Sequence, residues 1–339
     1  EYTRGLIASI LAAGGCEITV LTSRSSYTGE GNVRRLSLPF RTDHLAGRLA
    51  ADFIHPLWLP RVPLVHYPKG FLPGLRPKCA LLCGTVHDLI LQHYIDHYPH
   101  SRSRVAFAYW LHALKQSLPR FDLILTISEF SANAIREFCF RHRLVCPPVR
   151  VTGEGCRWED EPLRRSEKRN YLLHLGSQEP HKRTATLIEY WKALGIADLR
   201  LVVVGSVTEE VQRSISENSA IELLPALPED ELKTLLSESR ALLLPSELEG
   251  FGLPALEAYA LGTPVVYVRG TAVEELLGPG TRGGFELAAP DSLRLAIESL
   301  LQLSPAEIEA TRSRLLERYS WSECVRKTIS SYKEFLGGR

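Results

Sequence analysis

In the second half of the chain, short apolar runs alternate with stretches that repeat apolar residues at helical spacing. The apolar runs predict strands at residues 171–175, 200–204, 221–224, 241–244 and 264–268. The stretches between them predict helices at residues 184–194, 209–216, 229–237 and 254–261. Because strands that alternate with helices form parallel sheets, this half is expected to be a Rossmann-like α/β domain.

The first half shows the same alternation with longer interruptions. Strands are expected at residues 17–21, 33–38, 63–67, 80–86 and 121–127, and helices at residues 2–13, 43–53, 105–116 and 131–140. A doubly wound domain normally begins with a strand and a turn, whereas this sequence begins with a helix, opens on Glu1 and contains no methionine. We therefore expect the sequence to be incomplete and to lack that first strand and turn.

A change of pattern near residue 150 predicts the boundary between two domains. Pro147 and Pro148 interrupt the apolar periodicity, and a charged run follows at residues 157–169. Residues 1–150 carry 18 Lys and Arg against 10 Asp and Glu, a balance of +8, and residues 151–339 carry 22 against 29, a balance of −7. A basic first domain favours an anionic acceptor or an anionic membrane surface, although solvated Arg side chains give the same balance.

The composition narrows the class of protein. With 45% hydrophobic residues the chain can bury the cores of two soluble domains, and no run of about eighteen apolar residues predicts a membrane span. The seven cysteines, an odd number without a CxxC pair, indicate reduced thiols in a cytosolic protein. Nucleic acid is not expected as a partner, because no motif interleaves aromatic and basic residues.

The stretch at residues 241–266 carries the strongest candidate chemistry. An apolar strand is followed by a loop at residues 247–252 and then by a helix. Gly250 and Gly252 flank Phe251, so the backbone can approach a ligand closely, and Pro254 suits the first helical position. The exposed amides of Gly252 and Leu253 would then face an anion at the carboxyl edge of the sheet.

Two carboxylates frame this expected anion site. Glu249 lies in the loop and Glu257 in the first or second turn of the helix, so both can accept hydrogen bonds from hydroxyl groups. An anion site between two such acceptors suits a phosphorylated sugar. Each feature alone is explained equally well by structure, since the helix dipole favours an acidic residue in a first turn.

A second turn carries basic residues that could bind the same anion. Gly176 and Ser177 follow the strand at residues 171–175, and His181, Lys182 and Arg183 stand at the start of the next helix. The helix dipole disfavours cations at an N-terminus, so their placement there indicates a bound anion that offsets it.

Together these motifs resemble the retaining nucleotide-sugar glycosyltransferases of the GT-B type, especially glycosyltransferase family 4 (group 1). The two glutamates, Glu249 and Glu257, are eight residues apart with Gly-Phe-Gly-Leu-Pro between them, which is similar to the family's signature. The resemblance is densest over residues 170–268. It implies two Rossmann-like domains that face each other across a cleft, with the donor bound by residues 151–318 and the acceptor by residues 1–150. In that family, the first turn that this sequence lacks is a Gly-rich loop.

The resemblance also implies roles for single residues. Glu249 would bind hydroxyls of the transferred sugar, Glu257 the ribose and Lys182 the diphosphate. The segment Thr85-Val86-His87-Asp88 resembles the family segment whose His reaches the sugar, so His87 would act from the first domain, although a strand-end His is often satisfied locally. The donor site would be completed by Gly176, Ser177, Arg183, Pro225, Ala226, Gly250, Phe251, Gly252 and Leu253. Many relatives carry Arg where this chain has Ser177, so either other cations compensate or turnover is weak.

Other segments keep a second interpretation. The turn at residues 126–131 resembles the family's turn near the cleft, but Ser128 or Ser131 also makes a good helix N-cap. Residues 54–75, rich in proline and poor in charge, form either a packed connection or a surface for an apolar partner. His93 and His97 have the spacing of zinc ligands on a helix without an evident third ligand, so we expect no metal site.

The resulting hypothesis is a retaining hexosyltransferase that moves a sugar from a nucleotide diphosphate-sugar to a glycan or lipid-linked acceptor in polysaccharide biosynthesis. No Asp-x-Asp pair occurs in the chain, which argues against a divalent ion, and no cofactor is expected. The His-Asp-Leu and Glu-Pro-x-Lys segments look most like bacterial mannosyltransferases that use GDP-mannose, and UDP-sugars stay open.

The expected place of this enzyme is the cytoplasm, at the inner face of the membrane and in peripheral contact with anionic lipid. The segment Tyr319-Ser320-Trp321-Ser322 resembles the start of the family's closing helix, so residues 319–339 would cross back to the first domain. The alternatives are a nucleotide-sugar-binding protein with weak or no transfer activity, and a sugar-nucleotide epimerase or phosphorylase on the same fold. A NAD dehydrogenase is disfavoured, because neither half shows GxGxxG in its first turn.

Overall fold

The computed structural model describes residues 2–22, 33–38, 53–163, 166–196 and 198–337. The chain divides into two compact units, and the first of them takes residues from both ends of the sequence. The N-terminal unit comprises Glu1–Gly155 and Tyr319–Arg339, and the C-terminal unit comprises Cys156–Arg318. The sequence places the boundary at residue 150, five residues earlier than the division in the structure.

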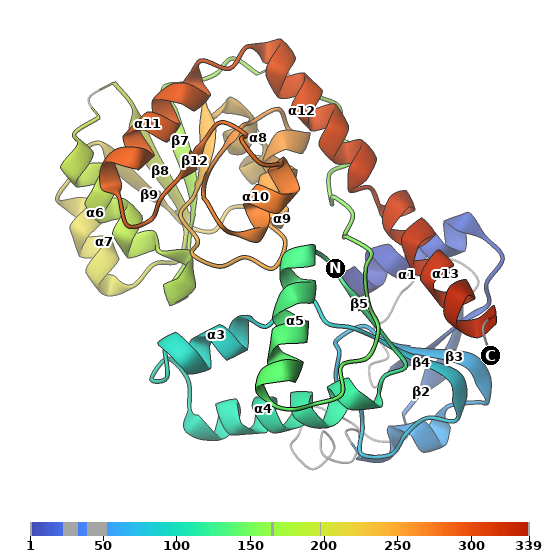
Figure 1. The fold of residues 1–339 in the computed structure, drawn as a ribbon. Helices are drawn as coiled ribbons and strands as arrows, with labels where there is room; N and C mark the ends of the chain where they lie inside the picture. The colour runs from blue at the N-terminus through green and yellow to red at the C-terminus, as the bar shows by residue number, and fades with distance from the viewer. Residues whose placement is uncertain (1, 23–32, 39–52, 164–165, 197, 338–339) are drawn as a thin grey trace. The chain divides into compact units, whose positions relative to one another are not determined.

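The C-terminal unit is built on one six-stranded parallel sheet (Figure 1). Its strands are β7 (Tyr171–Gly176), β8 (Arg200–Gly205), β9 (Ile221–Leu224), β10 (Ala241–Leu244), β11 (Val265–Val268) and β12 (Gly284–Phe285). Its helices are η3 (Pro180–Lys182), α6 (Thr184–Leu194), α7 (Glu209–Ser216), α8 (Glu229–Glu238), α9 (Leu253–Ala260), α10 (Ala272–Leu277), α11 (Pro290–Leu301) and α12 (Pro305–Arg318).

The order of these strands reverses once, at the centre of the sheet. The sheet runs β12-β11-β10-β7-β8-β9, so the chain moves outward from β7 in one direction and then returns to lay β10 on its other side. This is the doubly wound order in which ligands bind outside the carboxyl ends of the strands, where the order reverses. The reversal lies between β7 and β10, whose register pairs His174 with Leu243.

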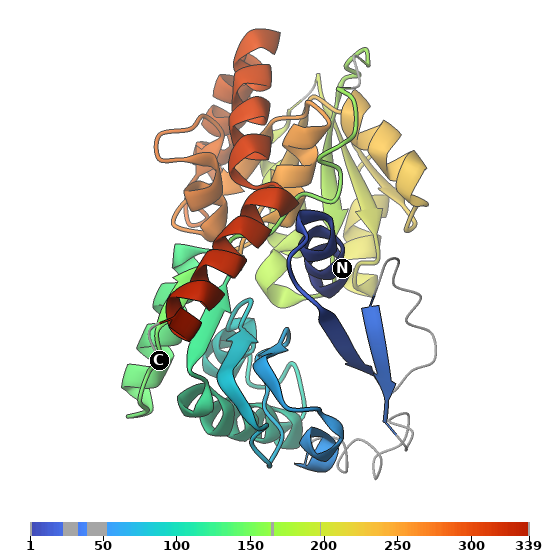
Figure 2. The same ribbon diagram turned by 90° about the vertical axis from the view of Figure 1, so that its right-hand side faces the viewer.

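The N-terminal unit contains two parallel sheets (Figure 2). One pairs β1 (Ile18–Thr22) with β2 (Val33–Ser37), and the other runs in the order β3 (Val62–Tyr67), β4 (Cys79–Thr85), β5 (Leu123–Thr126) and β6 (Val149–Val151). The helices are α1 (Tyr2–Ala13), η1 (His55–Trp58), α3 (Ile90–His97), α4 (Arg104–Ser117), η2 (Leu118–Arg120), α5 (Glu129–Arg141) and α13 (Trp321–Gly337).

Alternating side chains of the four-stranded sheet form two separate cores. Leu82 and Ile124 point to the face covered by α4 and α5. Leu81 and Leu125 point to the opposite face, where Tyr332, Phe335 and Leu336 of α13 pack on them. The last helix of the chain therefore completes the first unit, because without it one face of this sheet would lack its apolar cover.

A buried hydrogen-bond network fastens α13 to this sheet. His66 on β3 bonds to the Tyr332 hydroxyl through Nδ1 and to Thr85 Oγ1 through Nε2, each at 2.7 Å. Thr85 Oγ1 also lies 3.3 Å from the hydroxyl of Tyr2 on α1. Burial lowers the pKa of His66 to about 4, so the imidazole is neutral near neutral pH and matches its two neutral partners.

Helix α9 is held at its C-terminal end by two cations. Lys168 Nζ donates to the carbonyl oxygens of Ser237 and Gly262 at 2.8 and 3.1 Å, and Arg312 Nε on α12 donates to the carbonyl of Ala260 at 2.9 Å. Cations are favoured at the C-terminal ends of helices because they satisfy the last carbonyl groups and interact favourably with the negative end of the dipole. The N-terminal end of α9 is instead positioned by the loop that follows β10.

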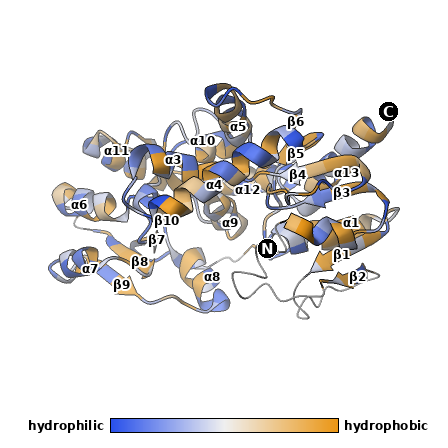
Figure 3. Cartoon of the chain, turned by 90° about the horizontal axis from the view of Figure 1, so that it is seen from below, coloured by the Kyte–Doolittle hydropathy of each residue, from blue (hydrophilic) through white to orange (hydrophobic). Residues whose placement is uncertain are grey.

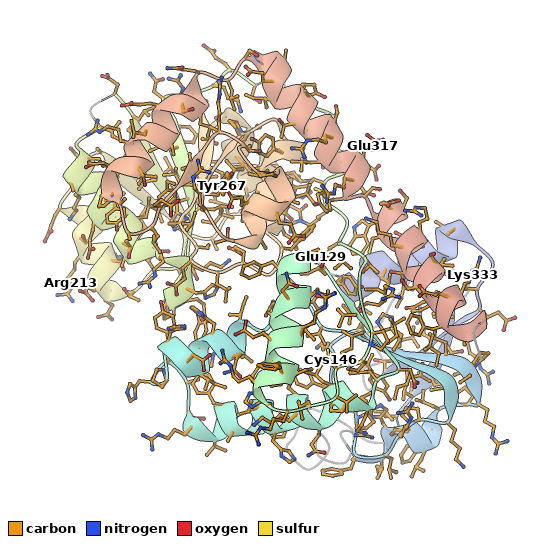
Figure 4. All side chains as sticks on the ribbon, viewed as in Figure 1. Glu129, Cys146, Arg213, Tyr267, Glu317 and Lys333 are labelled. Atoms are coloured by element: carbon orange, nitrogen blue, oxygen red, sulfur yellow. The ribbon has the colours of Figure 1, made fainter. Side chains whose placement is uncertain are left out.

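The helices that cover the sheets are amphipathic, and in Figure 3 both α3 and α4 carry hydrophilic and hydrophobic residues along their length. Figure 4 shows the same division in single side chains: Tyr267 on β11 is fully buried inside the C-terminal unit, while Arg213 on α7 points to solvent. Among the described residues, no helix is both long enough and apolar enough to cross a bilayer.

Most of the predicted elements are confirmed. The bounds of α1, α6, α7, β9 and β10 match the predicted ranges at both ends. The sequence analysis did not identify β6, β12, α10, α11 or α12. The helix expected at residues 43–53 lies outside the described residues except for Phe53. All seven cysteines are free thiols, as expected.

Close packing around Trp321 generates a stability prediction. A Cβ atom added to Gly155 would lie 2.3 Å from the Trp321 ring, a distance that forces the ring or the backbone to move. Gly155→Ala should therefore lower the free energy of unfolding by about 1–3 kcal/mol, as overpacked substitutions do. Gly337→Ala, where nothing lies within 4 Å, is the matched control and should change stability far less. Equal effects of the two substitutions in urea unfolding would contradict the packing argument.

Candidate functional site

The loop between β10 and α9 turns sharply at Gly252. Gly252 has φ of +98°, and a Cβ atom there would lie 2.9 Å from Val273 Cγ2, so both backbone angle and space require glycine. Helix α9 begins at Leu253, and Pro254 therefore occupies the second helical position and not the first as predicted. Phe251 is 4% exposed and anchors the loop in the core.

This turn leaves two backbone amides directed away from the helical ladder. The first intrahelical bonds are donated by Ala255 and Leu256, both to the carbonyl of Gly252, at 2.9 and 3.2 Å. Pro254 has no N–H, so the amides of Gly252 and Leu253 are the donors that the start of α9 presents outside its own helix. Both follow β10 at the carboxyl edge of the sheet, as the sequence predicts for an anion site.

An ion pair joins this loop to the turn after β7. Lys182 ends the short helix η3 (Pro180–Lys182), and its Nζ donates to Glu249 Oε1 at 2.7 Å. The Glu249 side chain is 8% exposed and that of Lys182 is 29% exposed. The structure thus brings two of the predicted site residues into direct contact, one from each side of the strand reversal.

A second ion pair lies beside the first. Arg183 Nε donates to Glu247 Oε2 at 2.7 Å, and the backbone amide of Glu247 donates to the carbonyl of His181 at 3.0 Å. Arg183 has φ of +51°, in the left-handed region that costs a non-glycine residue on the order of 1–3 kcal/mol. These contacts hold the two loops together, and the sequence analysis did not single out Glu247.

His174 sits beneath both loops and fixes the turn after β7. Its Nδ1 lies 3.0 Å from the carbonyl of Leu243 and its Nε2 lies 3.0 Å from Thr184 Oγ1. A carbonyl accepts only, so Nδ1 carries the proton and Nε2 accepts from the Thr184 hydroxyl. Thr184 Oγ1 in turn accepts from the amide of Ser177 at 3.2 Å, which ties the turn to the start of α6.

The remaining residues of this turn are placed by backbone contacts. A Cβ atom on Gly176 would lie 2.8 Å from Val203 Cγ1, so glycine lets the end of β7 pass close to β8. Ser177 Oγ accepts from the amide of Glu179 at 3.1 Å and shapes the turn. His181 is buried, and burial followed by the charge of Lys182 lowers its pKa. Lys182 and Arg183 are therefore the cationic side chains of this segment.

Glu257, on the inner side of α9, is paired with a residue that the sequence analysis did not identify. Arg157 Nε donates to Glu257 Oε1 at 3.2 Å, and the guanidinium lies 4.5 Å from the centre of the Trp158 ring. Trp158 Nε1 donates to Glu229 Oε1 at 2.8 Å, while Arg157 Nη1 lies 3.9 Å from the other oxygen of Glu229. Arg157 is thus held between an aromatic ring and two carboxylates. The positions of these charged and aromatic residues along the sequence did not indicate that they would come together.

The other donor candidates also follow strands at the carboxyl edge of the sheet. Pro225 and Ala226 directly follow β9, the outermost strand on the β8 side of the sheet, so they stand two strands away from β7. Gly250 lies in the β10 loop and is buried. The structure therefore distributes the predicted donor residues over the carboxyl ends of β7, β9 and β10.

The candidate residues of the N-terminal unit have local partners. His87 Nε2 donates to the carbonyl of Pro68 at 3.2 Å, and its ring meets the ring of Tyr2 edge-on at 4.5 Å. Burial lowers the pKa of His87, so its imidazole is neutral at neutral pH. Asp88 Oδ1 accepts from the amide of Ile90 at the start of α3. The carbonyl of Pro68 therefore fixes the tautomer of His87.

The structure also bears on the hypotheses about Ser128 and about the pair His93 and His97. Ser128 is the N-cap of α5 and its side chain accepts from the amide of Ser131 at 3.0 Å, as the capping interpretation expects. His93 and His97 stack on α3 with ring centres 4.4 Å apart. Within the described ranges, no three His, Cys, Asp or Glu side chains are grouped as metal ligands.

Comparisons with known proteins identify the class of this site. A family model described as glycosyl transferases group 1 matches residues 158–315, which lie within the C-terminal unit. The chain is 28% identical over 293 residues to O-antigen chain mannosyltransferase B of Escherichia coli, covering 80% of this chain and 74% of that protein. It is 27% identical over 263 residues to O-antigen chain mannosyltransferase RfbU of Salmonella typhimurium, covering 72% of each.

The fold agrees with these matches. The structure of sucrose-phosphate synthase from Thermosynechococcus elongatus aligns with a TM-score of 0.69 at 18% identity, over 100% of this chain and 93% of that one. The predicted GT-B class and the resemblance to group 1 glycosyltransferases are confirmed. Residues 158–315 match the model of group 1 glycosyl transferases, and the chain is similar to mannosyltransferases in sequence and to a GT-B enzyme in fold.

The buried His174 generates a pH prediction. Burial lowers its folded pKa from 6.5 to about 4, so the unfolded chain takes up the proton first as pH falls. Its contribution to stability is fully present above pH 6.5 and is lost progressively toward pH 4, a change of about 3 kcal/mol.

We expect His174→Gln to be less stable than the native chain at neutral pH, with a difference that narrows as pH falls through this window. Urea unfolding at several pH values measures it, and His100→Gln, an exposed histidine, is the control. A constant difference between His174→Gln and the native chain would rule out the neutral imidazole as the cause.

Proposed function

We propose that the chain transfers mannose from GDP-mannose to a glycan or lipid-linked acceptor with retention of anomeric configuration and without a metal ion. The observation that carries the proposal is the ion pair of Lys182 and Glu249 across the strand reversal, beside the start of α9, where the amides of Gly252 and Leu253 donate no bond within the helix. Cation, carboxylate and amides are the groups that a sugar diphosphate needs. The mannosyltransferase names of the two curated relatives support the choice of sugar.

The chemistry requires positive charge at the leaving group. Transfer breaks the bond between the anomeric carbon and the diphosphate oxygen, forms a bond to the acceptor hydroxyl, and releases the nucleoside diphosphate and the acceptor's proton. Negative charge develops on the leaving phosphate, where Lys182 and the amides of Gly252 and Leu253 would stabilise it in place. These donors are fixed by the fold before the reaction, so the transition state gains their interaction without reorganisation.

Glu249 would serve the sugar. When the diphosphate binds, Lys182 has a second anion to pair with, and Glu249 can accept hydrogen bonds from sugar hydroxyls while it still neutralises the cation. Its low exposure makes an uncompensated carboxylate costly, which favours a site that always supplies it with donors. Sugar orientation and leaving-group charge are then controlled by one pair of side chains. His87 would contribute from the N-terminal unit.

A metal ion is not needed in this proposal. Lys182, Arg183 and the two amides supply four groups with positive charge or positive dipole around the anion site. Transfer in the presence of EDTA at an undiminished rate is the expected result, and a rate restored only by added Mg²⁺ or Mn²⁺ would overturn this part.

The acceptor is proposed to be a growing glycan, free or linked to lipid at the inner face of the membrane. The basic balance of residues 1–150, +8 in formal charge, favours an anionic acceptor or surface near this unit. The names of the two curated relatives, both O-antigen chain mannosyltransferases, support a polysaccharide product.

Lys182→Ala tests the catalytic charge. Loss of one preorganised donor at a developing anion costs about 2.7–4 kcal/mol, so kcat should fall on the order of a hundredfold or more. The control is Lys192→Ala, which removes a lysine of α6 paired with Glu217 at 3.5 Å, outside the proposed site. Steady-state transfer and melting temperature are measured for both variants. Normal turnover by a folded Lys182→Ala protein would refute the assignment.

Arg157 and Glu257 generate a binding prediction. If Glu257 accepts from the ribose hydroxyls while Arg157 holds its Oε1, Glu257→Gln and Arg157→Gln should each weaken a ribonucleoside diphosphate by roughly tenfold, the scale of one charged hydrogen bond. Binding of the 2′,3′-dideoxy analogue should hardly change. Thermal shift with EDTA present, against GDP, UDP and ADP, measures these affinities and also identifies the base.

Arg213→Gln, an exposed arginine of α7, is the control for the loss of positive charge. Equal losses for the ribose and dideoxy ligands would show that the pair only supports the helix, as a structural cap does.

A further inference from the structure

The segment from Phe53 to His87 is one of unusual charge. Its 35 residues include four cations, Arg61, Lys69, Arg76 and Lys78, and no aspartate or glutamate. All four cations are exposed in the structure. From sequence this region is either a packed connection or a surface for an apolar partner, and the proposed donor site makes no use of residues 53–80.

The structure shows that large apolar side chains of this segment face solvent. Leu57 and Trp58 of η1 (His55–Trp58) are 68% and 37% exposed, and Phe53 just before them is 60% exposed. Phe71 and Leu75, in the loop between β3 and β4, are 39% and 44% exposed. Isolated apolar groups on a surface need no explanation, but five within 23 residues favour a binding surface.

Backbone contacts join the two ends of the segment. The amide of Leu75 donates to the carbonyl of Phe53 at 3.1 Å, and a Cβ atom on Gly74 would lie 2.5 Å from the Phe53 ring. The apolar residues before β3 and those after it are therefore neighbours in the fold. We call the surface formed by Phe53, Leu57, Trp58, Phe71 and Leu75, with the cations Arg61 and Lys78, the apolar-basic surface.

The cations of this surface lack ion-pair partners among the described residues. Arg76, close to this surface in the sequence, pairs with Asp122 at 2.8 Å, whereas Arg61 and Lys78 form no ion pair with any described residue. Arg61 and Lys78 border a hollow of about 420 Å³ where β3 and β4 begin, lined also by Val62, Pro63, Cys79 and Ala80. Two cations that pair with no described residue, at the edge of this hollow, fit an anionic headgroup with its adjoining hydrocarbon.

We propose that the apolar-basic surface docks the enzyme on an anionic lipid bilayer. The absence of acidic residues from this segment suits a negatively charged surface, and exposed Trp and Phe rings suit the boundary between headgroups and acyl chains. Each cation near an anionic membrane raises binding by roughly fivefold, and the apolar side chains add the second signal that stable anchoring requires. The inference deepens the proposed function by assigning the surface through which a lipid-linked acceptor is approached.

The first test measures cosedimentation with phosphatidylcholine vesicles made with and without phosphatidylglycerol. The native chain should bind the anionic vesicles much more strongly, and added salt should weaken the binding. Leu57→Asp and the double variant Arg61→Glu/Lys78→Glu should each reduce binding by about tenfold or more. Binding to neither type of vesicle, or equal binding to both, would overturn the proposal.

A matched control distinguishes binding through this surface from nonspecific binding through any exposed apolar side chain. Phe140 on α5 belongs to the same unit and is 86% exposed, so Phe140→Asp removes an equally exposed apolar group elsewhere. Phe140→Asp should bind anionic vesicles like the native chain, and an equal loss in this variant would contradict the assignment. Melting temperatures of all variants establish that they are folded.

A second readout separates the inference from the proposed function. Transfer to a water-soluble acceptor should be unchanged in Leu57→Asp, while transfer to the same glycan on anionic vesicles should fall by about tenfold. If soluble transfer is absent in the native chain, the proposed function fails whatever the vesicles show. If soluble transfer is normal and vesicles are not bound, only the docking surface is wrong.

Discussion

The C-terminal unit depends on one neutral imidazole. His174 links the carbonyl of β10 to the hydroxyl that starts α6, and through that hydroxyl to the amide of Ser177. Three elements that each carry part of the site are thereby held in register by a group that has one donor and one acceptor. A protonated ring would have two donors and could not accept from Thr184, so the geometry of the turn requires the neutral form that burial favours.

The charged residues of the candidate site are held in ion pairs. Lys182 and Arg183 each have a carboxylate partner in the β10 loop, and Glu257 has Arg157. Buried or half-buried ions are tolerated only with partners, so these pairs keep the loops together while no donor is bound. In the proposed function, a phosphate and sugar hydroxyls would exchange into the same pairs without leaving any ion alone. The proposed binding site and the contacts that hold its loops together would then be made of the same side chains.

Much of this could be predicted from the sequence, and the limits are physical. Strands such as β8 and β10 were located because buried parallel strands are continuous apolar runs, and the β10 loop because only glycine permits the backbone that Gly252 adopts. The pairing of Arg157 with Glu257, one hundred residues apart, has no signature in the sequence, since only the folded chain brings the turn that holds Arg157 next to α9. His174 reads as one more residue of an apolar strand, because its role lies entirely in partners supplied by the fold. Short β12 and the helices α10 to α12 lie in stretches where the apolar runs are too brief or too mixed to separate strand from helix.

The division of the first unit between both ends of the chain has a consequence for synthesis. Tyr332, Phe335 and Leu336 cover Leu81, Leu125 and their neighbours, and they are translated after every residue of the C-terminal unit. A ribosome therefore releases a complete, contiguous C-terminal unit while the earlier sheet still shows one bare apolar face. During that interval the nascent N-terminal unit is the part that a chaperone would hold and that aggregation would threaten, although it was made first.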